Sequence, residues 1–442
     1  MAEGYGAPVR MAASCSRGSV DLPHILRAVP SGWLADGGVV RRVRAAMSQA
    51  PALIRALTDR ADVGFQGERP WDLQVHNPRL YGDLLRRGSL ALGEGYVNGD
   101  WDCGALDVLF TRLLSQPACR DAAIGFQPMA RLQARAQQLA ERWVNWQSRR
   151  RAFLVGQQHY DIDDRVYGAM LDSRRLYSCG YWQDAADLEA AQLHKLQRIC
   201  QKLDLQPGQR LLDIGCGWGG LALHAARHYG VEVVGITVSA QQARYCREQC
   251  RDLPVEVLLC DYRSDLVKQQ GLFDRIVSIG MLEHVGRRND RTYFEGISDR
   301  LAPDGLALIQ TIGSHDTNMA LDPWINTYIF PNGRLPSAQQ LCQGFEPWFL
   351  LEDWENFGYD YDLTLLAWWR NFERAWPGLA EHLGHRFYRL WKYYLLSCAG
   401  FFRSGQGQLW QLVLSKKGSI KAYRSIRPRL CESANAGAAV AL

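Results

Sequence analysis

Short apolar runs alternate with helical patterns through the second half of the chain. The runs cover residues 210–214, 231–236, 255–259, 273–278 and 305–310, and each has a length typical of a β-strand. Helix-like stretches separate them. Repeated strand–helix units predict a parallel sheet with helices on both faces, because each crossover must lie against the sheet. We therefore expect an α/β catalytic domain with a Rossmann-like doubly wound sheet over residues 151–420.

The first part of the chain has a different pattern. Residues 1–45 are rich in Gly, Ala, Ser and Arg without sustained periodicity, which predicts a poorly ordered extension. Residues 46–130 predict a small, mainly helical N-terminal domain, with a helical run at 106–114 and loops at Gly93, Gly95 and Gly99. Residues 421–442 are small, polar or alanine-rich and predict a loose tail.

Residues 131–150 predict an amphipathic linker helix between these two domains. One helical face carries Leu132, Ala136, Leu139, Trp143 and Trp146. Leu132, Ala136 and Trp143 each directly follow an arginine. Arginine beside tryptophan suits a helix at a membrane surface, because guanidinium groups can reach phosphates while indoles lie at headgroup level. A helix that only packs on its own protein has the same pattern, so both interpretations stay open.

The charge distribution makes the front third the candidate for contact with anionic material. The formal net charge is +5, and residues 1–150 hold 19 Arg, no Lys and 14 acidic residues. A membrane surface and nucleic acid both fit that excess. The 12 Cys form no C-x-x-C pair, which favours a reducing compartment over disulfides or zinc. Without a signal peptide or a run of about 20 apolar residues, we expect a cytoplasmic protein.

A glycine-rich turn follows the first apolar run. Gly215, Gly217 and Gly219 let the backbone approach a nucleoside closely at the carboxyl end of the strand. Dinucleotide-binding folds use similar turns, but the spacing of their third glycine is absent and Asp213 stands inside the strand end. This pattern favours S-adenosylmethionine as the cofactor.

The polar residues that follow the next two strands are candidates for the rest of the cofactor. The second strand ends without the acidic residue that usually binds ribose, so we expect Thr237 and Gln242 to take that role. Asp261 is placed to accept a hydrogen bond from the adenine amino group, with Tyr262 beside it. Each of these residues could instead be a turn residue or a helix cap.

Eight motifs occur in the order seen in the cyclopropane fatty acid synthase and mycolic acid cyclopropane synthase family. They are HYD (159–161), YSC (177–179), LDIGCGWGG (212–220), GITVS (235–239), DYR (261–263), MLEHVG (281–286), WINTYIFPNG (324–333) and YYLLSCAGFF (393–402). The resemblance covers about residues 52–417, and residues 88–96 (GSLALGEGY) resemble the lipid-facing N-terminal domain of the full-length bacterial enzymes. It implies a class I S-adenosylmethionine-dependent methyltransferase acting on unsaturated phospholipid at a membrane surface.

The chemistry implied by this resemblance is the addition of a methylene bridge across a cis double bond. An isolated alkene is a poor nucleophile, so the enzyme must hold it against the sulfonium methyl group and tolerate a carbocation. A dry pocket lined by aromatic rings does both. Ring closure then requires removal of a proton, and in the resembling family the base is a bound bicarbonate ion.

Carried over by motif, the bicarbonate ligands would be Cys179, Glu283, Tyr361 and the backbone of Ile312. The family's usual histidine is replaced by Gln310, which can donate a hydrogen bond but cannot titrate near neutral pH. By the same resemblance, Tyr177 and Ser178 would bind the methionyl carboxylate of the donor. Cys398 is the weakest catalytic candidate. His315 could compensate for Gln310, although a surface loop position is the expectation.

Three alternative functions are compatible with parts of this pattern. Transfer without ring closure would give a methyl- or methylene-branched chain. A catalytically silent lipid-binding module should have lost the glycine turn or Glu283, and both are present. A nucleic-acid methyltransferase lacks support because its Asn-Pro-Pro-Tyr type of motif is absent. We expect no nucleic-acid partner and no metal, and a homodimer is possible.

Overall fold

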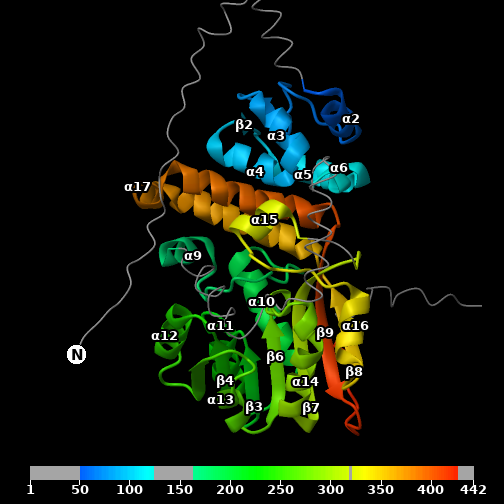
Figure 1. Cartoon of the computed structure of the whole chain (residues 1–442). Helices are drawn as coiled ribbons and strands as arrows, with labels where there is room; N and C mark the ends of the chain where they lie inside the picture. The colour runs from blue at the N-terminus through cyan, green and yellow to red at the C-terminus, as the bar shows by residue number, and fades with distance from the viewer. Residues whose placement is uncertain (1–49, 124–162, 318–320, 427–442) are drawn as a thin grey trace, which may run out of the picture. The chain divides into compact units, whose positions relative to one another are not determined.

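The computed structural model describes residues 50–123, 163–317 and 321–426. Its main feature is a seven-stranded sheet with the order β5-β4-β3-β6-β7-β9-β8 (Figure 1). The strands are β3 (Arg210–Ile214), β4 (Glu232–Thr237), β5 (Val255–Leu259), β6 (Phe273–Ile279), β7 (Leu301–Ser314), β8 (Phe349–Asn356) and β9 (Gly407–Lys416). Strands β3 to β7 pair in parallel, and β9 runs antiparallel between β7 and β8. This confirms the expected Rossmann-like α/β fold.

Alternate residues of the central strands belong to two different cores, which is the pattern of a sheet covered on both faces. Leu212 and Ile276 pack in one core, whereas Leu211 and Val277 pack in the other. The covering helices are α10 (Leu188–Lys202), α11 (Gly220–Tyr229), α12 (Ala240–Gln249), α13 (Asp265–Gln269), α14 (Asp290–Arg300) and α16 (Ala338–Phe345). All five predicted strands are present within a few residues of their expected bounds, whereas β8 and β9 were not predicted.

The front helices share a core with the C-terminal part of the chain. They are α2 (Ala52–Arg60), α3 (Arg79–Arg87), α4 (Ser89–Asn98), α5 (Leu106–Ser115) and α6 (Pro117–Ala122), with a short β1–β2 pair (Gln74–Val75 and Trp101–Asp102). Helices α4 and α5 pack on α17 (Tyr359–Arg403), α4 also contacts α15 (Pro323–Tyr328), and α9 (Asp164–Met170) contacts α17. The described residues from 50 onward therefore form one compact unit, and the division at residue 130 stays a prediction.

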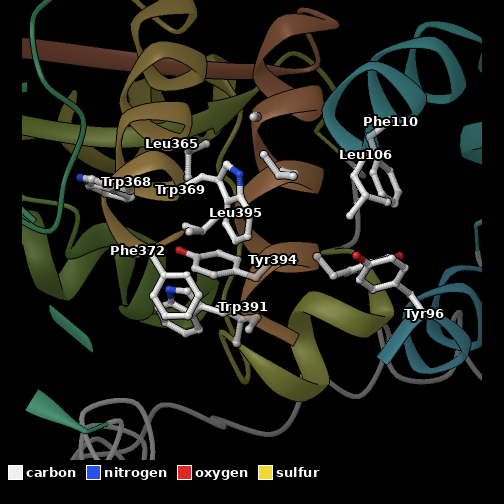
Figure 2. Close-up of a cluster of buried hydrophobic side chains, with 14 of the residues drawn as sticks. Tyr96, Leu106, Phe110, Leu365, Trp368, Trp369, Phe372, Trp391, Tyr394 and Leu395 are labelled. Carbon is white, nitrogen blue, oxygen red and sulfur yellow. The ribbon is translucent and has the colours of Figure 1, made fainter. Parts of the chain in front are cut away.

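Aromatic side chains dominate this shared core. Helix α17 has a non-helical residue at Gly384 (φ 72°), so it consists of two helical arms. Trp368 and Phe372 of the first arm face Trp391 and Tyr394 of the second, and all four are buried (Figure 2). Phe110 of α5 extends the cluster from the other side (Figure 2). Much of the aromatic content of the chain thus fixes the long helical hairpin that covers the carboxyl edge of the sheet.

Two of the glycines expected in a loop lie inside a helix instead. The prediction of loops at Gly93 and Gly95 is wrong, because both are buried in α4. A Cβ on Gly93 would lie 2.3 Å from the Trp324 ring, and one on Gly95 would lie 2.8 Å from Leu80. These glycines allow close helix packing rather than a turn. Gly99, with φ 83°, does end the helix as expected.

Several sequence predictions fall partly or wholly outside the described residues. They are the extension at 1–45, the linker helix at 131–150, the HYD motif and most of the tail. The first tail residues are ordered against the protein, since Tyr423 packs on the core and Ser425 donates a 2.9 Å hydrogen bond to Asp353. Across the described ranges, no helix is long and apolar enough to cross a membrane.

Candidate active site

A cavity of about 300 Å³ lies at the carboxyl ends of β3, β4, β6 and β7. This is the position where open α/β sheets bind ligands, beside the point at which the strand order reverses. Of the candidate residues, thirteen line the cavity: Tyr177, Ser178, Asp213, Gly215, Gly217, Thr237, Gln242, Asp261, Tyr262, Glu283, Gln310, Ile312 and Tyr361. The structure thus brings together most of a set that spans nearly two hundred positions of sequence.

The glycine turn opens toward the cavity at two of its three glycines. Gly215 and Gly217 have positive φ angles of 85° and 55°, and a Cβ on Gly217 would meet no atom within 4 Å. Gly219 differs from the expectation, because it does not line the cavity. Its φ is 84°, and a Cβ there would lie 2.2 Å from the Cys246 sulfur, so it serves the close packing of α11 and α12.

Asp213 presents a buried carboxylate at the floor of the cavity. Its Oδ2 atom has no hydrogen-bond partner among the described residues. Burial raises the pKa of this carboxyl to about 7. A buried oxygen without a partner is costly unless a ligand donor reaches it, which makes Asp213 a candidate acceptor for a cationic ligand group.

The candidates for ribose and adenine already contact one another. The Thr237 hydroxyl donates a 2.9 Å hydrogen bond to Oε1 of Gln242, which leaves the Gln242 amide hydrogens for a ligand. Asp261 is held by Arg263, with Nε–Oδ1 and Nη2–Oδ2 distances of 2.7 and 2.8 Å. Its carboxylate oxygens can still accept a further bond. The hydroxyl of Tyr262 is buried and has no hydrogen-bond partner in the described part of the chain.

Glu283 lies in the short 3₁₀ helix η3 (Leu282–His284), directly after β6. Its Oε1 accepts a 2.6 Å hydrogen bond from the backbone N–H of Ile312. The structure differs here from the expectation, because the Ile312 amide hydrogen is already used by Glu283. The second oxygen, Oε2, is buried with no hydrogen-bond partner among the described residues, and burial raises the pKa of Glu283 to about 7.

Gln310 is buried on β7 and pairs with a residue that the sequence analysis missed. Gln411 lies directly opposite on β9, and its Nε2 donates a 2.9 Å hydrogen bond to Oε1 of Gln310. This bond fixes the amide so that the Gln310 nitrogen is the group left for the cavity. His315 is exposed and does not line the cavity, as expected for a surface loop residue.

Tyr361, Cys179 and Cys398 lie close together beside Glu283. Burial raises the pKa of the Tyr361 hydroxyl well above the usual value, and Tyr361 packs against the core cluster that contains Cys179. The Cys179 thiol contacts the Thr364 hydroxyl at 3.6 Å, and burial raises its pKa too. Cys398 has a pKa raised to about 12 by burial, so its thiol stays protonated and is a poor nucleophile. Neither cysteine lines the cavity itself.

The methionyl candidates lie at another part of the cavity wall. The Tyr177 hydroxyl is 2.7 Å from the Tyr394 hydroxyl of α17, and Ser178 Oγ accepts a 2.7 Å hydrogen bond from Lys195. Lys195 is fully buried and lines the cavity, as do Tyr394 and Phe330. Sequence analysis missed these three residues, because an isolated lysine in a helix is usually exposed and the two aromatic residues lie within longer motifs.

Comparisons with known proteins show which family the chain resembles. The family model described as mycolic acid cyclopropane synthetase matches residues 147–412. The cyclopropane-fatty-acyl-phospholipid synthase of Escherichia coli K12 is 48% identical over 360 residues, covering 81% of this chain and 92% of that protein. The tuberculostearic acid methyltransferase UfaA1 of Mycobacterium tuberculosis is 30% identical, with 88% and 94% covered.

A solved structure shows the same relationship in three dimensions. The mycolic acid cyclopropane synthase CmaA1, complexed with SAH and CTAB, is 31% identical and aligns with a TM-score of 0.55. The alignment covers 60% of this chain and 98% of that one. From the sequence match over more than half its length, the chain belongs to the mycolic acid cyclopropane synthetase family.

Proposed function

We propose that this chain transfers a methylene group from S-adenosylmethionine to the cis double bond of a phospholipid acyl chain, forming a cyclopropane ring. The observation that carries this function is the 48% identity to the Escherichia coli cyclopropane-fatty-acyl-phospholipid synthase across 92% of that protein. The cavity supports it chemically, because one part is polar and glycine-lined and another is aromatic and apolar.

The polar part of the cavity suits the methyl donor. Gly217 leaves room for a nucleoside, Gln242 offers amide hydrogens to the ribose, and Asp261 can accept from the adenine amino group. Asp213 can accept from the α-ammonium group through its unpartnered Oδ2. The CmaA1 complex contains SAH, the demethylated product of this donor. Replacing Gly217 by Val should abolish donor binding in calorimetry, and unchanged affinity would contradict this placement.

The aromatic part of the cavity suits the acyl chain and the cation that forms on it. Tyr361, Tyr394 and Phe330 line it with aromatic faces, which attract positive charge without trapping it as a covalent product. The high pKa of the Tyr361 and Tyr394 hydroxyls, caused by burial, keeps both neutral. Water exclusion at this point favours ring closure over capture of the cation as an alcohol.

Glu283 and its neighbours fit a bicarbonate ion. When bound, bicarbonate supplies the base that takes a proton from the transferred methyl group. The unpartnered Oε2 of Glu283 is an acceptor suited to an anion that carries its own O–H, while Tyr361 and Gln310 have hydrogens to donate to the anion. The Ile312 amide orients Glu283 instead of contacting the anion itself. Because burial raises the pKa of Glu283 to about 7, this acceptor is fully ionised only above neutral pH.

A second product is favoured by one observation, the glutamine at position 310. Without the family's histidine, the cation can lose a proton without closing the ring, which leaves a methylene-branched chain or, after an additional reduction, a saturated methyl branch; a relative, UfaA1, is named as a tuberculostearic acid methyltransferase. Gln310→His should retain or raise ring formation if Gln310 only donates a hydrogen bond. Loss of ring formation in a folded, donor-binding variant would show that the pocket depends on glutamine.

The substrate places the reaction at a membrane surface. The excess of arginine in residues 1–150 supports contact with anionic lipid, and Arg135 and Arg142 are the residues that we expect to make it. Their joint replacement by Glu should lower vesicle binding while sparing activity on detergent-solubilised lipid. Equal vesicle binding would favour a helix that packs only on its own protein. A cytoplasmic location and a homodimer remain predictions, the latter open to light scattering.

The decisive test of the proposed function is product analysis. Purified protein is incubated with vesicles of a cis-unsaturated phospholipid and isotope-labelled donor, and the acyl chains are analysed by mass spectrometry and proton NMR. A cyclopropane adds the mass of one CH₂ group and removes the olefinic protons. A methylene branch adds the same mass but keeps olefinic protons, and a saturated methyl branch needs an additional reduction. Absence of label in lipid would overturn the proposal.

A further inference from the structure

One buried charge at the cavity has no part in the function described so far. Lys195 lies on α10 with its side chain fully buried, and it lines the cavity. Its ammonium group donates a 2.7 Å hydrogen bond to the hydroxyl of Ser178. Gln192, one helical turn earlier, donates to the backbone oxygens of Ser178 and Leu176 at 2.8 and 3.3 Å. Helix α10 therefore fixes the segment that carries Tyr177 and Ser178.

The ammonium group of Lys195 is incompletely matched. A lysine nitrogen has three hydrogens to donate, and the hydroxyl of Ser178 is the one hydrogen-bond acceptor that it meets in the described part of the chain. Burying a charge without a nearby partner is energetically unfavourable. Two donor positions thus remain at the cavity wall.

The carboxylate whose charge acts on Lys195 is already occupied. Asp172 acts on Lys195 through its charge but forms no ion pair with it among the described residues. Its oxygens accept from the backbone N–H groups of Leu176 and Arg174 at 2.8 and 3.3 Å, and the Arg174 guanidinium lies at 3.6 Å. Asp172 therefore shapes the turn before Ser178 and leaves Lys195 facing the cavity.

We propose that Lys195 binds the carboxylate of the donor's methionyl group, together with the Ser178 hydroxyl. This inference rests on the proposed function, because it names the charge that recognises the amino-acid end of S-adenosylmethionine. A carboxylate supplies the acceptors that the ammonium lacks and the opposite charge that its burial demands. Asp213, at the end of β3, offers the matching acceptor for the α-ammonium group.

Ligands that differ only at the amino-acid end test this assignment. S-adenosylhomocysteine carries the carboxylate, whereas 5′-methylthioadenosine keeps the nucleoside and sulfur without it. Lys195→Met should weaken binding of S-adenosylhomocysteine roughly 10- to 100-fold, the range for a lost charged hydrogen bond, and should leave 5′-methylthioadenosine affinity unchanged in calorimetry. Decarboxylated S-adenosylmethionine, which keeps the ammonium, should also bind wild type and variant equally.

Two additional variants separate recognition from structure. Lys195→Gln keeps a donor for Ser178 without the charge and should show the same ligand-selective loss. Lys202→Met removes another buried lysine of α10. Its ammonium group donates a 2.6 Å hydrogen bond to Glu355 and does not line the cavity. This substitution should lower stability yet leave the ratio of the two affinities unchanged.

The possible results distinguish this inference from the proposed function. Equal loss of both ligands in the Lys195 variants would mean that the lysine only supports the segment, and no loss of S-adenosylhomocysteine binding would mean that it has no role in recognition. Either result overturns the inference and leaves the proposed function standing. Failure of the wild-type protein to bind either ligand would instead overturn the donor site itself.

Discussion

The buried carboxyl group of Glu283 makes a quantitative prediction about stability and pH. Burial raises its pKa from 4.5 to about 7, so the folded protein holds this proton more tightly than the unfolded chain does. Such a group contributes stability that is fully present below pH 4.5 and is lost as the pH rises to 7. At about 1.4 kcal/mol per unit, the loss between pH 5 and pH 8 is about 2 to 3 kcal/mol.

Replacing Glu283 by Gln removes this titration while keeping an oxygen for the Ile312 amide. The free energy of unfolding of the wild type should therefore fall between pH 5 and pH 8 by about 2 to 3 kcal/mol more than that of the variant. The change with pH is compared, rather than either value alone, because any constant cost of the new amide then cancels. Asp213→Asn should behave similarly, since burial also raises the pKa of Asp213 to about 7.

Urea unfolding, followed by tryptophan fluorescence in bicarbonate-free buffer at a series of pH values, measures these free energies. The exposed Glu346 offers a matched control, and its replacement by Gln should leave the pH dependence of the wild type unchanged. Parallel curves for the wild type and Glu283→Gln would refute the reasoning. In activity assays Glu283→Gln should lower ring formation without lowering donor affinity, because the carboxylate acts on the anion and not on the nucleoside.

Two further predictions concern packing and the amide pair. Gly93→Ala should cost about 1 to 3 kcal/mol of stability, because its Cβ would lie 2.3 Å from Trp324. Gly82 is exposed on α3 and a Cβ there would meet no atom within 4 Å, so Gly82→Ala should gain about 0.5 to 1 kcal/mol. Thermal unfolding of both variants compares them, and equal effects would contradict the packing role of Gly93. Gln411→Leu should cost about 1 to 3 kcal/mol of stability by leaving Gln310 without its buried partner. It should also lower the fraction of ring product in lipid analysis. An unchanged fraction would mean that this bond does not orient Gln310.

The sequence predicted the parallel part of the sheet because its strands are short, mostly apolar runs that alternate regularly with helical patterns. Strands β8 and β9 escaped for a physical reason. Strand β8 lies at the edge of the sheet, contains three acidic residues and exposes Leu350 and Leu351, while β9 contains two glutamines among its apolar residues. The glycines at 93 and 95 were misassigned because a glycine that admits a neighbouring helix has the same local signal as one in a turn.

Most of the candidate site could be predicted through its motifs, since the residues follow strands that end at one edge of the sheet. The partners that hold those residues could not be predicted. Gln411 acts through its register opposite Gln310, and Lys195 through the packing of α10 on the segment that carries Ser178. Such contacts join positions far apart in sequence and leave no local pattern. The Ile312 amide likewise could not be assigned to Glu283 before their separation was known.

The fate of the methyl hydrogens tests the central claim most directly. The protein is incubated with cis-unsaturated phospholipid vesicles and S-adenosylmethionine whose methyl group is fully deuterated, and the lipid product is examined by mass spectrometry. If the enzyme transfers the methyl group and the bicarbonate bound by Glu283 and its neighbours removes a proton, the product is a cyclopropane that keeps two of the three deuterons. A product that keeps all three deuterons, or one that keeps two but shows olefinic carbons in NMR, would mean that the methyl group is transferred without ring closure, and would contradict the account.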